Sequence, residues 1–385
     1  MSTSGVFTRR RLDSVDFLRG AIMIVMALDH TRDFFSVAAP ITGTLPLFLT
    51  RWITHFCAPV FFLLTGTSAR LSLARKGRRG LSRYLLTRGL WIGFLEVVVV
   101  RCLAYQFNVD FRVTMLLDLW ALGWAMVLLA ALVWLPDTAL IAIGVAMIGG
   151  HNLLDGVRSA QPLWVVLHQP GFLLNSTAHT VFVAYPLIPW VGVTILGFVL
   201  GRTYEWVGTL RQALLFPLGC VMSLLFLVGR WVDVYGEPVK WRHMGTASQT
   251  LISFLNVTKQ PPSLLFLLMT LGPALIVLSI ADHKTPRWLQ PAVTIGRVPL
   301  FYYIGHFFLI HAAAVATSLV INGRAHWLFE SPDLGHYPFT QPPGWGVSLP
   351  TVYLIWLAVV CAMYPACRWF AALKQRRRDW WLSYL

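Results

Sequence analysis

Residues 9–35 read RRRLDSVDFLRGAIMIVMALDHTRDFF and combine an apolar stretch long enough to enter a bilayer with an unusual amount of charge. From Asp16 onward its ionisable side chains are Asp16, Arg19, Asp29, His30, Arg32 and Asp33. An ionised group at membrane depth costs roughly 2.5–3.5 kcal/mol on insertion scales, so such groups usually face a cavity and mark function. A simple anchor would need only apolar residues. The stretch therefore predicts a first membrane helix that carries chemistry.

The composition of the chain places this helix in a membrane protein. Hydrophobic residues make up 57% and charged residues only 12% of the 385 residues, whereas a soluble domain has about 25% charged residues. The net charge of +15 could suggest nucleic acid, but the basic residues flank apolar spans, where lipid headgroups and orientation signals explain them. We therefore expect membrane lipids and no nucleic acid as partners, and one domain over residues 1–385.

Apolar runs of the length that crosses a bilayer recur along the whole chain. They lie at residues 17–35, 47–70, 84–104, 113–134, 138–153, 180–201, 211–229, 263–281, 298–320 and 349–370. A further apolar stretch at 161–174 is short enough for a re-entrant or interfacial helix. A membrane barrel would instead show short alternating segments. The prediction is an all-α polytopic helix bundle of about ten transmembrane helices, with core helices over 17–370 and a basic tail at 371–385.

Lysine and arginine indicate the orientation of these helices. The tract ARKGRRGLSRYLLTR at 74–88 follows the second span, and short basic loops face the cytoplasm. An even number of spans then puts both termini on the cytoplasmic side, in agreement with the basic tail. The loops near 154–179, 230–262 and 321–348, rich in Trp, Pro, Gly and His, would face outward. We expect a multi-pass protein of the cytoplasmic (inner) membrane.

Helical spacing sorts the charges of the first span. Arg19 and His30 are eleven residues apart, close to three turns, so they share a face about 16 Å apart along the axis. Arg19 would bind an anion near the cytoplasmic end, and His30 would act as a base in the outer half. Asp29 and Asp33 flank the histidine, where an acceptor would fix its tautomer and raise its basicity. The alternative is a histidine–carboxylate pair that only joins helices.

Two later segments place polar side chains in apolar surroundings. Lys259 precedes Pro261-Pro262, which suits the first turn of a helix, so the lysine would stand at a helix N-terminus that favours an anion or an oxyanion. The alternative is a lysine that only anchors the helix. Tyr302 and His306 are four residues apart and share a face, where they could line a cavity; a structural histidine fits equally well.

The sequence shows no metal-binding motif. His306 and His311 are five residues apart and so point in different directions around a helix, and HExxH is absent. The five cysteines lie in or beside apolar spans without a CxxC pair, and we interpret them as small core residues. We predict no metal. The other histidines near the outer loops receive no role: His151, His168, His179, His243, His326 and His336.

The segment YPLIPW at 185–190 puts two prolines into one predicted span. Proline removes a backbone donor and kinks or breaks a helix, and broken helices at membrane depth usually line a cavity. The segment therefore indicates a central cavity, which both an enzyme and a transporter could use.

Several separated motifs occur in a fixed order along the chain. The first helix contains LDSVDFLRG and MALDHTRDFF, and it is followed by YPLIPWVGVTILG at 185–197, NVTKQPPSLLFLLMTLGP at 256–273, GRVPLFYYIGHFFLIH at 296–311 and a weaker DWWLSYL at the end. Over nearly the whole chain these motifs resemble the heparan-α-glucosaminide N-acetyltransferase-like family and, more loosely, the wider transmembrane acyltransferase superfamily.

The resemblance implies that acyl-CoA, with acetyl-CoA as the expected donor, binds from the cytoplasmic side and passes its acyl group across the membrane to a sugar or amine acceptor, typically an amino sugar. It also implies that His30 is catalytic, as a general base or as an acyl carrier. Asp29 or Asp33 would orient it, and Arg19 and Arg297 would bind the donor. The expected acceptor-binding residues are Arg32, Asn256, Lys259, Tyr302 and His306.

A proton-coupled small-molecule transporter is the competing prediction, because a carrier would also use buried Asp, His and Arg side chains and a broken helix. The sequence shows no internal repeat of the transporter kind, and its charge is concentrated on one helix. Trp-rich outer loops favour a sugar of the cell envelope as acceptor, because aromatic faces stack on sugar rings. A single copy and a homodimer both remain open.

Overall fold

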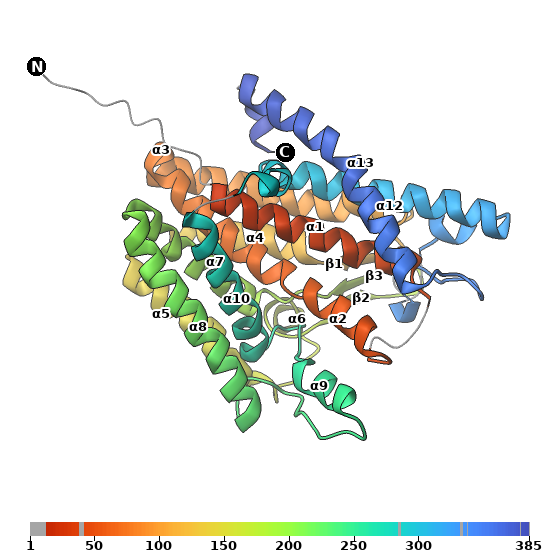
Figure 1. Cartoon of the computed structure of the whole chain (residues 1–385), viewed down its shortest axis with the longest axis horizontal. Helices are drawn as coiled ribbons and strands as arrows, with labels where there is room; N and C mark the ends of the chain where they lie inside the picture. The colour runs from red at the N-terminus through yellow and green to blue at the C-terminus, as the bar shows by residue number, and fades with distance from the viewer. Residues whose placement is uncertain are drawn as a thin grey trace, which may run out of the picture.

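The structure is a computed structural model that describes residues 13–37, 42–283, 286–331, 334–336, 338–377 and 379–384. Helices account for most of these residues (Figure 1). Within them, seven helical segments are long and apolar enough to cross a membrane. The all-α polytopic membrane bundle predicted from hydropathy is therefore confirmed.

Each of the ten predicted spans contains a helix. The long helices are α1 (Asp13–Phe35), α2 (Leu45–Thr54), α3 (Cys57–Phe94), α4 (Asp118–Leu132), α5 (Asp137–Gly150), α7 (Leu187–Leu200), α8 (Gly208–Val232), α10 (Leu264–His283), α12 (Pro299–Asn322) and α13 (Leu349–Arg376). The shorter ones are α6 (Pro162–Leu167), α9 (Ala247–Leu255) and α11 (Gln290–Gly296). Single 3₁₀ turns cover His151–Leu154, Gly201–Glu205, Arg287–Leu289, His326–Phe329, Leu334–His336 and Trp380–Ser383.

Two of the predicted spans lie in α3, which consists of two helices that meet at a kink at Gly77. Gly77 has a φ of 65°, a conformation that glycine adopts without strain. The chain thus breaks between the two predicted spans, at 47–70 and 84–104. The basic tract at 74–88 is helical on both sides of the kink, because arginine and lysine are good helix formers. A π-helix, Leu95–Tyr105, extends the second of these helices.

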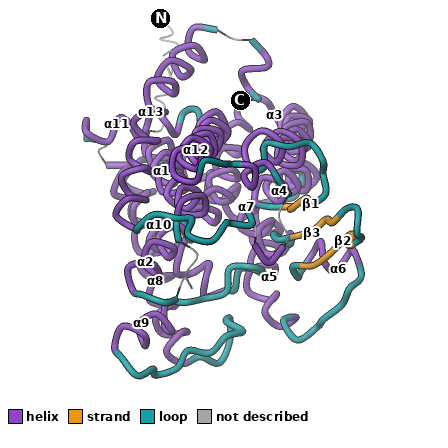
Figure 2. Tube along the Cα trace, turned by 90° about the vertical axis from the view of Figure 1, so that its right-hand side faces the viewer, coloured by secondary structure: helices purple, strands orange, loops and turns teal. Residues whose placement is uncertain are grey.

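A small sheet accompanies the helices, and the sequence analysis missed it. Its strands are β1 (Val113–Leu116), β2 (Gly171–Asn175) and β3 (Thr180–Val183), in the order β1-β3-β2, with β1 parallel and β2 antiparallel to β3 (Figure 2). Two predicted spans, 113–134 and 180–201, therefore begin too early, because an apolar strand precedes each helix. The apolar stretch at 161–174 likewise divides into α6 and the start of β2.

The first and last described segments lie at the end of the bundle that holds the basic tract. Ser14 Oγ, on the first turn of α1, donates to Asp282 near the end of α10 at 3.1 Å. The hydroxyl of Tyr384 lies 2.8 Å from Thr87 Oγ1 on α3. We call this end the basic end; the sheet belongs to the other end.

Helix α1 is central and touches α3, α10, α11, α12 and α13. Its closest approach is to α11, where glycines leave no side chain between the two backbones. A Cβ atom added to Gly20 would lie 1.8 Å from the carbonyl oxygen of Ala292, and one added to Gly296 would lie 1.8 Å from the carbonyl oxygen of Asp16. Arg19 Nη1 also donates to the Gly296 carbonyl at 3.1 Å. These contacts fix how α1 is rotated against its neighbours.

We expect Gly20→Ala to destabilise the protein, because its methyl group would overlap the backbone of α11. Overpacking of this kind costs roughly 1–3 kcal/mol, which thermal unfolding of the purified protein in detergent would show as a lower Tm. Gly93→Ala is the matched control, since a Cβ there meets no atom within 4 Å. Equal unfolding temperatures for the two variants would contradict the close contact.

Candidate functional site

Two cavities border α1. The histidine cavity has a volume of about 760 Å³. Its polar and aromatic lining includes Asp29, His30, Arg32, Asp33, Arg51, Asp118, Tyr185, Lys259 and Gln260. The basic cavity has a volume of about 380 Å³ and lies at the basic end. Its basic residues are Arg19, Arg75, Arg88 and Lys374. The two residues that helical spacing placed on one face, Arg19 and His30, thus belong to different cavities.

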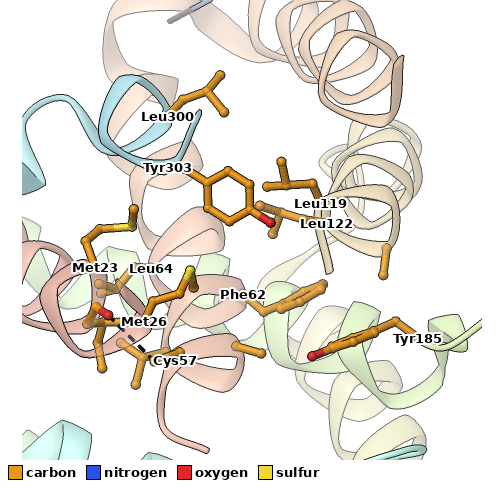
Figure 3. Close-up of a cluster of buried hydrophobic side chains, with 14 of the residues drawn as sticks. Met23, Met26, Cys57, Phe62, Leu64, Leu119, Leu122, Tyr185, Leu300 and Tyr303 are labelled. Carbon is orange, nitrogen blue, oxygen red and sulfur yellow. Dashed lines mark hydrogen bonds between the residues drawn. The ribbon is translucent and has the colours of Figure 1, made fainter. Parts of the chain in front are cut away.

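A cluster of buried, mostly apolar side chains (Figure 3) contributes to the lining of both cavities. Its labelled members are Met23, Met26, Cys57, Phe62, Leu64, Leu119, Leu122, Tyr185, Leu300 and Tyr303. Met26 and Tyr185 also line the histidine cavity, whereas Leu300 and Tyr303 also line the basic cavity. The Tyr303 hydroxyl donates to Asp118 Oδ1 at 3.4 Å, so a residue of one cavity contacts a residue of the other. The two cavities are therefore connected through this cluster.

A chain of hydrogen bonds fixes the tautomer of His30. His30 Nδ1 lies 2.8 Å from His306 Nε2, and His306 Nδ1 lies 2.8 Å from the carbonyl oxygen of Tyr302. A carbonyl can only accept, so His306 carries its proton on Nδ1, and as a neutral ring it accepts at Nε2. His30 must then donate from Nδ1. Its Nε2 keeps the lone pair that a base or a nucleophile needs.

The two carboxylates beside His30 are paired with arginines. Arg32 Nη2 lies 2.9 Å from Asp29 Oδ1 and 2.8 Å from Asp33 Oδ1, and Arg51 lies 3.7 Å from Asp29. His306, rather than Asp29 or Asp33, holds the position next to His30 Nδ1 in which an orienting carboxylate was expected. The arginine–carboxylate cluster instead places balanced charge along the wall of the histidine cavity.

Lys259 reaches the histidine cavity from a turn, not from a helix. α10 begins only at Leu264, where Ser263 Oγ accepts from the backbone N–H of Phe266 at 3.0 Å, so the expected position at a helix N-terminus is wrong. The Lys259 ammonium lies 5.9 Å from the centre of the Tyr185 ring. Burial, and then the charge of Arg51, hold the pKa of Lys259 below its usual range.

A half-buried carboxylate that the sequence analysis did not consider fixes this turn. Glu237 accepts from the backbone N–H of Thr258 at 3.0 Å, from the Thr258 hydroxyl at 2.5 Å and from the Ser263 hydroxyl at 2.6 Å. Thr258 and Ser263, the two residues that Glu237 binds, flank Lys259 in the sequence. The lysine is therefore presented to the cavity by a fixed backbone.

Four other predicted site residues lie away from the cavity in which each was expected. Asn256 ends α9, and its carbonyl accepts from Arg230 at 3.2 Å. Arg297 pairs with Asp13 at 3.1 Å and does not line the basic cavity. Tyr302 and His306 are fully buried and do not line the histidine cavity, so His306 reaches that cavity only through His30.

The match to known proteins covers the first part of this architecture. The sequence model of the family described as heparan-alpha-glucosaminide N-acetyltransferase, catalytic, matches residues 11–233, which is more than half of the chain. Among curated proteins, none matches. The matched range includes α1 with His30 and the cavity walls as far as Tyr185, and it ends before Lys259 and His306. The chain belongs to the heparan-alpha-glucosaminide N-acetyltransferase catalytic family.

Proposed function

We propose that this membrane protein is an acetyl-CoA-dependent acetyltransferase of the cytoplasmic membrane, with both termini inside, that passes an acetyl group to an amino sugar or a related glycan on the outer side. The observation that carries the proposal is the pair of cavities on α1: one is basic, the other contains His30, and an apolar cluster contributes to the lining of both. A transfer reaction between two aqueous compartments needs such an arrangement.

The basic cavity suits the donor. Acetyl-CoA carries phosphates, and the basic side chains at this cavity, Arg19, Arg75, Arg88 and Lys374, offer charge-assisted hydrogen bonds to them. Arg19 is held in place by Asp16 at 3.0 Å and by Ser68 at 2.6 Å. The uncharged pantetheine arm would then extend along α1 into the apolar cluster and bring the thioester toward His30.

The transfer step uses the free lone pair of His30. As an acyl carrier, Nε2 would form a bond to the acyl carbon while the carbon–sulfur bond breaks and the thiolate leaves; the acceptor amine would then displace the imidazole. As a general base, Nε2 would instead remove the proton of the amine during direct attack. In both cases Lys259 and Arg51 supply positive charge on the cavity wall for the developing oxyanion.

The histidine cavity suits a sugar acceptor. Its volume of about 760 Å³ lies within the usual range for small-molecule sites, roughly 300–1,000 Å³. Tyr185 offers an aromatic face, and Asp118 and Gln260 offer polar atoms of the kind that hydroxyl and amino groups bind. Strand residues Met115 and Phe182 and the turn at Lys259 line this cavity beside the helices, and in the proposed orientation the acceptor would enter from their side.

We expect His30→Ala to abolish the acceptor-dependent release of free thiol from acetyl-CoA by the purified protein in detergent with glucosamine. General base catalysis alone contributes roughly 10²–10⁴-fold, so the loss should reach at least that range. His179→Ala, an exposed histidine of an outer loop, should leave the rate unchanged. A well-folded wild type that neither binds acetyl-CoA nor releases thiol would overturn the proposal and favour a proton-coupled transporter.

We expect His306→Ala to lower kcat while leaving the KM for acetyl-CoA unchanged, because His306 sets the tautomer of His30 but does not line the basic cavity. The loss should be a fraction of the roughly 10²–10⁴-fold effect of the base itself. His306→Gln, whose amide oxygen can still accept from His30 Nδ1, should recover part of the rate. A KM effect without a kcat effect would contradict the positioning role.

We expect Arg75→Ala and Arg88→Ala to raise the KM for acetyl-CoA by about tenfold each, since a hydrogen bond to a charged group is worth about 1.5–3 kcal/mol. S-acetylpantetheine, which lacks the nucleotide and its phosphates, should react equally with wild type and variants. Arg324→Ala, an exposed arginine of another loop, is the control. If these variants raised the KM for S-acetylpantetheine as much as the KM for acetyl-CoA, Arg75 and Arg88 would not bind the phosphates, and the prediction would be wrong.

A further inference from the structure

A second group of chemically reactive side chains lies outside both cavities. His151 follows the last residue of α5, Asp155 follows the 3₁₀ turn that His151 begins, and His168 follows the last residue of α6. One ligand atom from each residue lies within 4.8 Å of the others. Both histidines are 2% exposed. Two imidazoles and a carboxylate are a frequent donor set for Zn²⁺.

The imidazole of His151 is buried, and its ring nitrogens are poorly hydrogen-bonded. Neither of its ring nitrogens has a hydrogen bond of regular geometry among the described residues; the backbone of Pro262 offers one of them only a weak hydrogen bond. An unsatisfied buried polar group costs about 1–3 kcal/mol. Its ring centre is 5.9 Å from that of His168, so the imidazole stands beside the other donors. A bound cation would remove this cost by taking the lone pair.

The other two donors already have the hydrogen bonds that metal ligands use. His168 Nε2 lies 3.0 Å from the carbonyl oxygen of His151; because a carbonyl only accepts, Nε2 carries the proton and Nδ1 keeps the lone pair. Asp155 Oδ2 accepts from Asn152 Nδ2 at 2.8 Å, which orients the carboxylate. Partners of this kind orient most metal-binding histidines and carboxylates.

We infer that His151, Asp155 and His168 form a binding site for a divalent transition metal, with Zn²⁺ as the best fit. Donors around a tetrahedral zinc, at about 2.0–2.2 Å from the ion, stand about 3.4 Å apart, so the group closes by about an ångström on binding. A small cavity of about 90 Å³ borders Asp155 and His168 and has room for a water molecule as fourth ligand.

The site connects directly to the turn that carries Lys259. Asn152 donates to Asp155 through Nδ2 and accepts from the backbone N–H of Leu264, the first residue of α10, through Oδ1 at 2.9 Å. Gln260 lines both the small cavity and the histidine cavity. A metal at this site would therefore stiffen the turn at 256–263 through Asn152, in addition to the hydrogen bonds of Glu237. The inference does not depend on acyl transfer.

Metal titration of the full-length protein tests the site. The protein is purified in detergent with a non-histidine tag, stripped with chelator and titrated with Co²⁺, whose visible absorption reports four-coordinate geometry, and then with Zn²⁺. We expect one Co²⁺ per chain, displaced by Zn²⁺, and a higher Tm with Zn²⁺. Wild type that binds no stoichiometric Co²⁺ or Zn²⁺ would overturn the inference.

Variants locate the ion. His151→Ala and His168→Ala should each lose the Co²⁺ spectrum, whereas His179→Ala, an exposed histidine, should keep it. Hydrogen exchange of the backbone at 256–263 should slow with Zn²⁺ in wild type and stay unchanged in His151→Ala. Asp155→Asn, which keeps the size of the side chain, should weaken binding while the protein stays folded. Full binding in the His151 and His168 variants would place the metal elsewhere and contradict the site.

Discussion

The backbone contact between Gly20 and Gly296 is the constraint on which the proposed site depends. Both glycines are needed, because a Cβ on either one would lie 1.8 Å from the opposite backbone. His30 follows Gly20 by ten residues and His306 follows Gly296 by ten residues, and α12 runs beside α1 from that contact onward. The glycine contact therefore sets the register at which the two imidazoles meet at 2.8 Å.

The same helix borders both cavities. Arg19 and His30 are eleven residues apart, which is about 16 Å along a helix, and they line the basic cavity and the histidine cavity. Between them α1 presents Met23 and Met26. Methionine is flexible and adapts its shape to its neighbours, so on the proposed function the pantetheine arm would pass here more easily than between branched side chains. Arg19 and His30, which would be costly to place in a bilayer, thus lie at the two ends of a short apolar segment of α1.

Hydropathy was sufficient to locate a helix in every predicted span. Helical spacing placed Arg19 and His30 on one face of α1, but it did not show that they line two different cavities. The partner of His30 could not be found in this way, because His306 is 276 residues away and only the packing of α12 on α1 brings it close. Asp118 could have been found from the sequence, because an ionisable residue inside an apolar span usually faces a cavity and Asp118 interrupts the predicted span 113–134. The sheet was missed because VTML and TVFV are as apolar as a membrane helix.

The turns around the small sheet and before α10 are stabilised in a different way from the helix bundle, and this explains where sequence motifs fail. These turns have little apolar surface to bury, so polar side chains fix them: Glu237 holds the turn around Lys259, and Asn152 links Asp155 to the start of α10. His151 and Asp155 are four residues apart, and His168 joins them only after α6 and the turn before it. A search for paired ligands on one helix cannot recognise such a group. The histidine cavity is walled in part by strands and by the turn that carries Lys259, and polar networks of this kind keep such turns in one conformation.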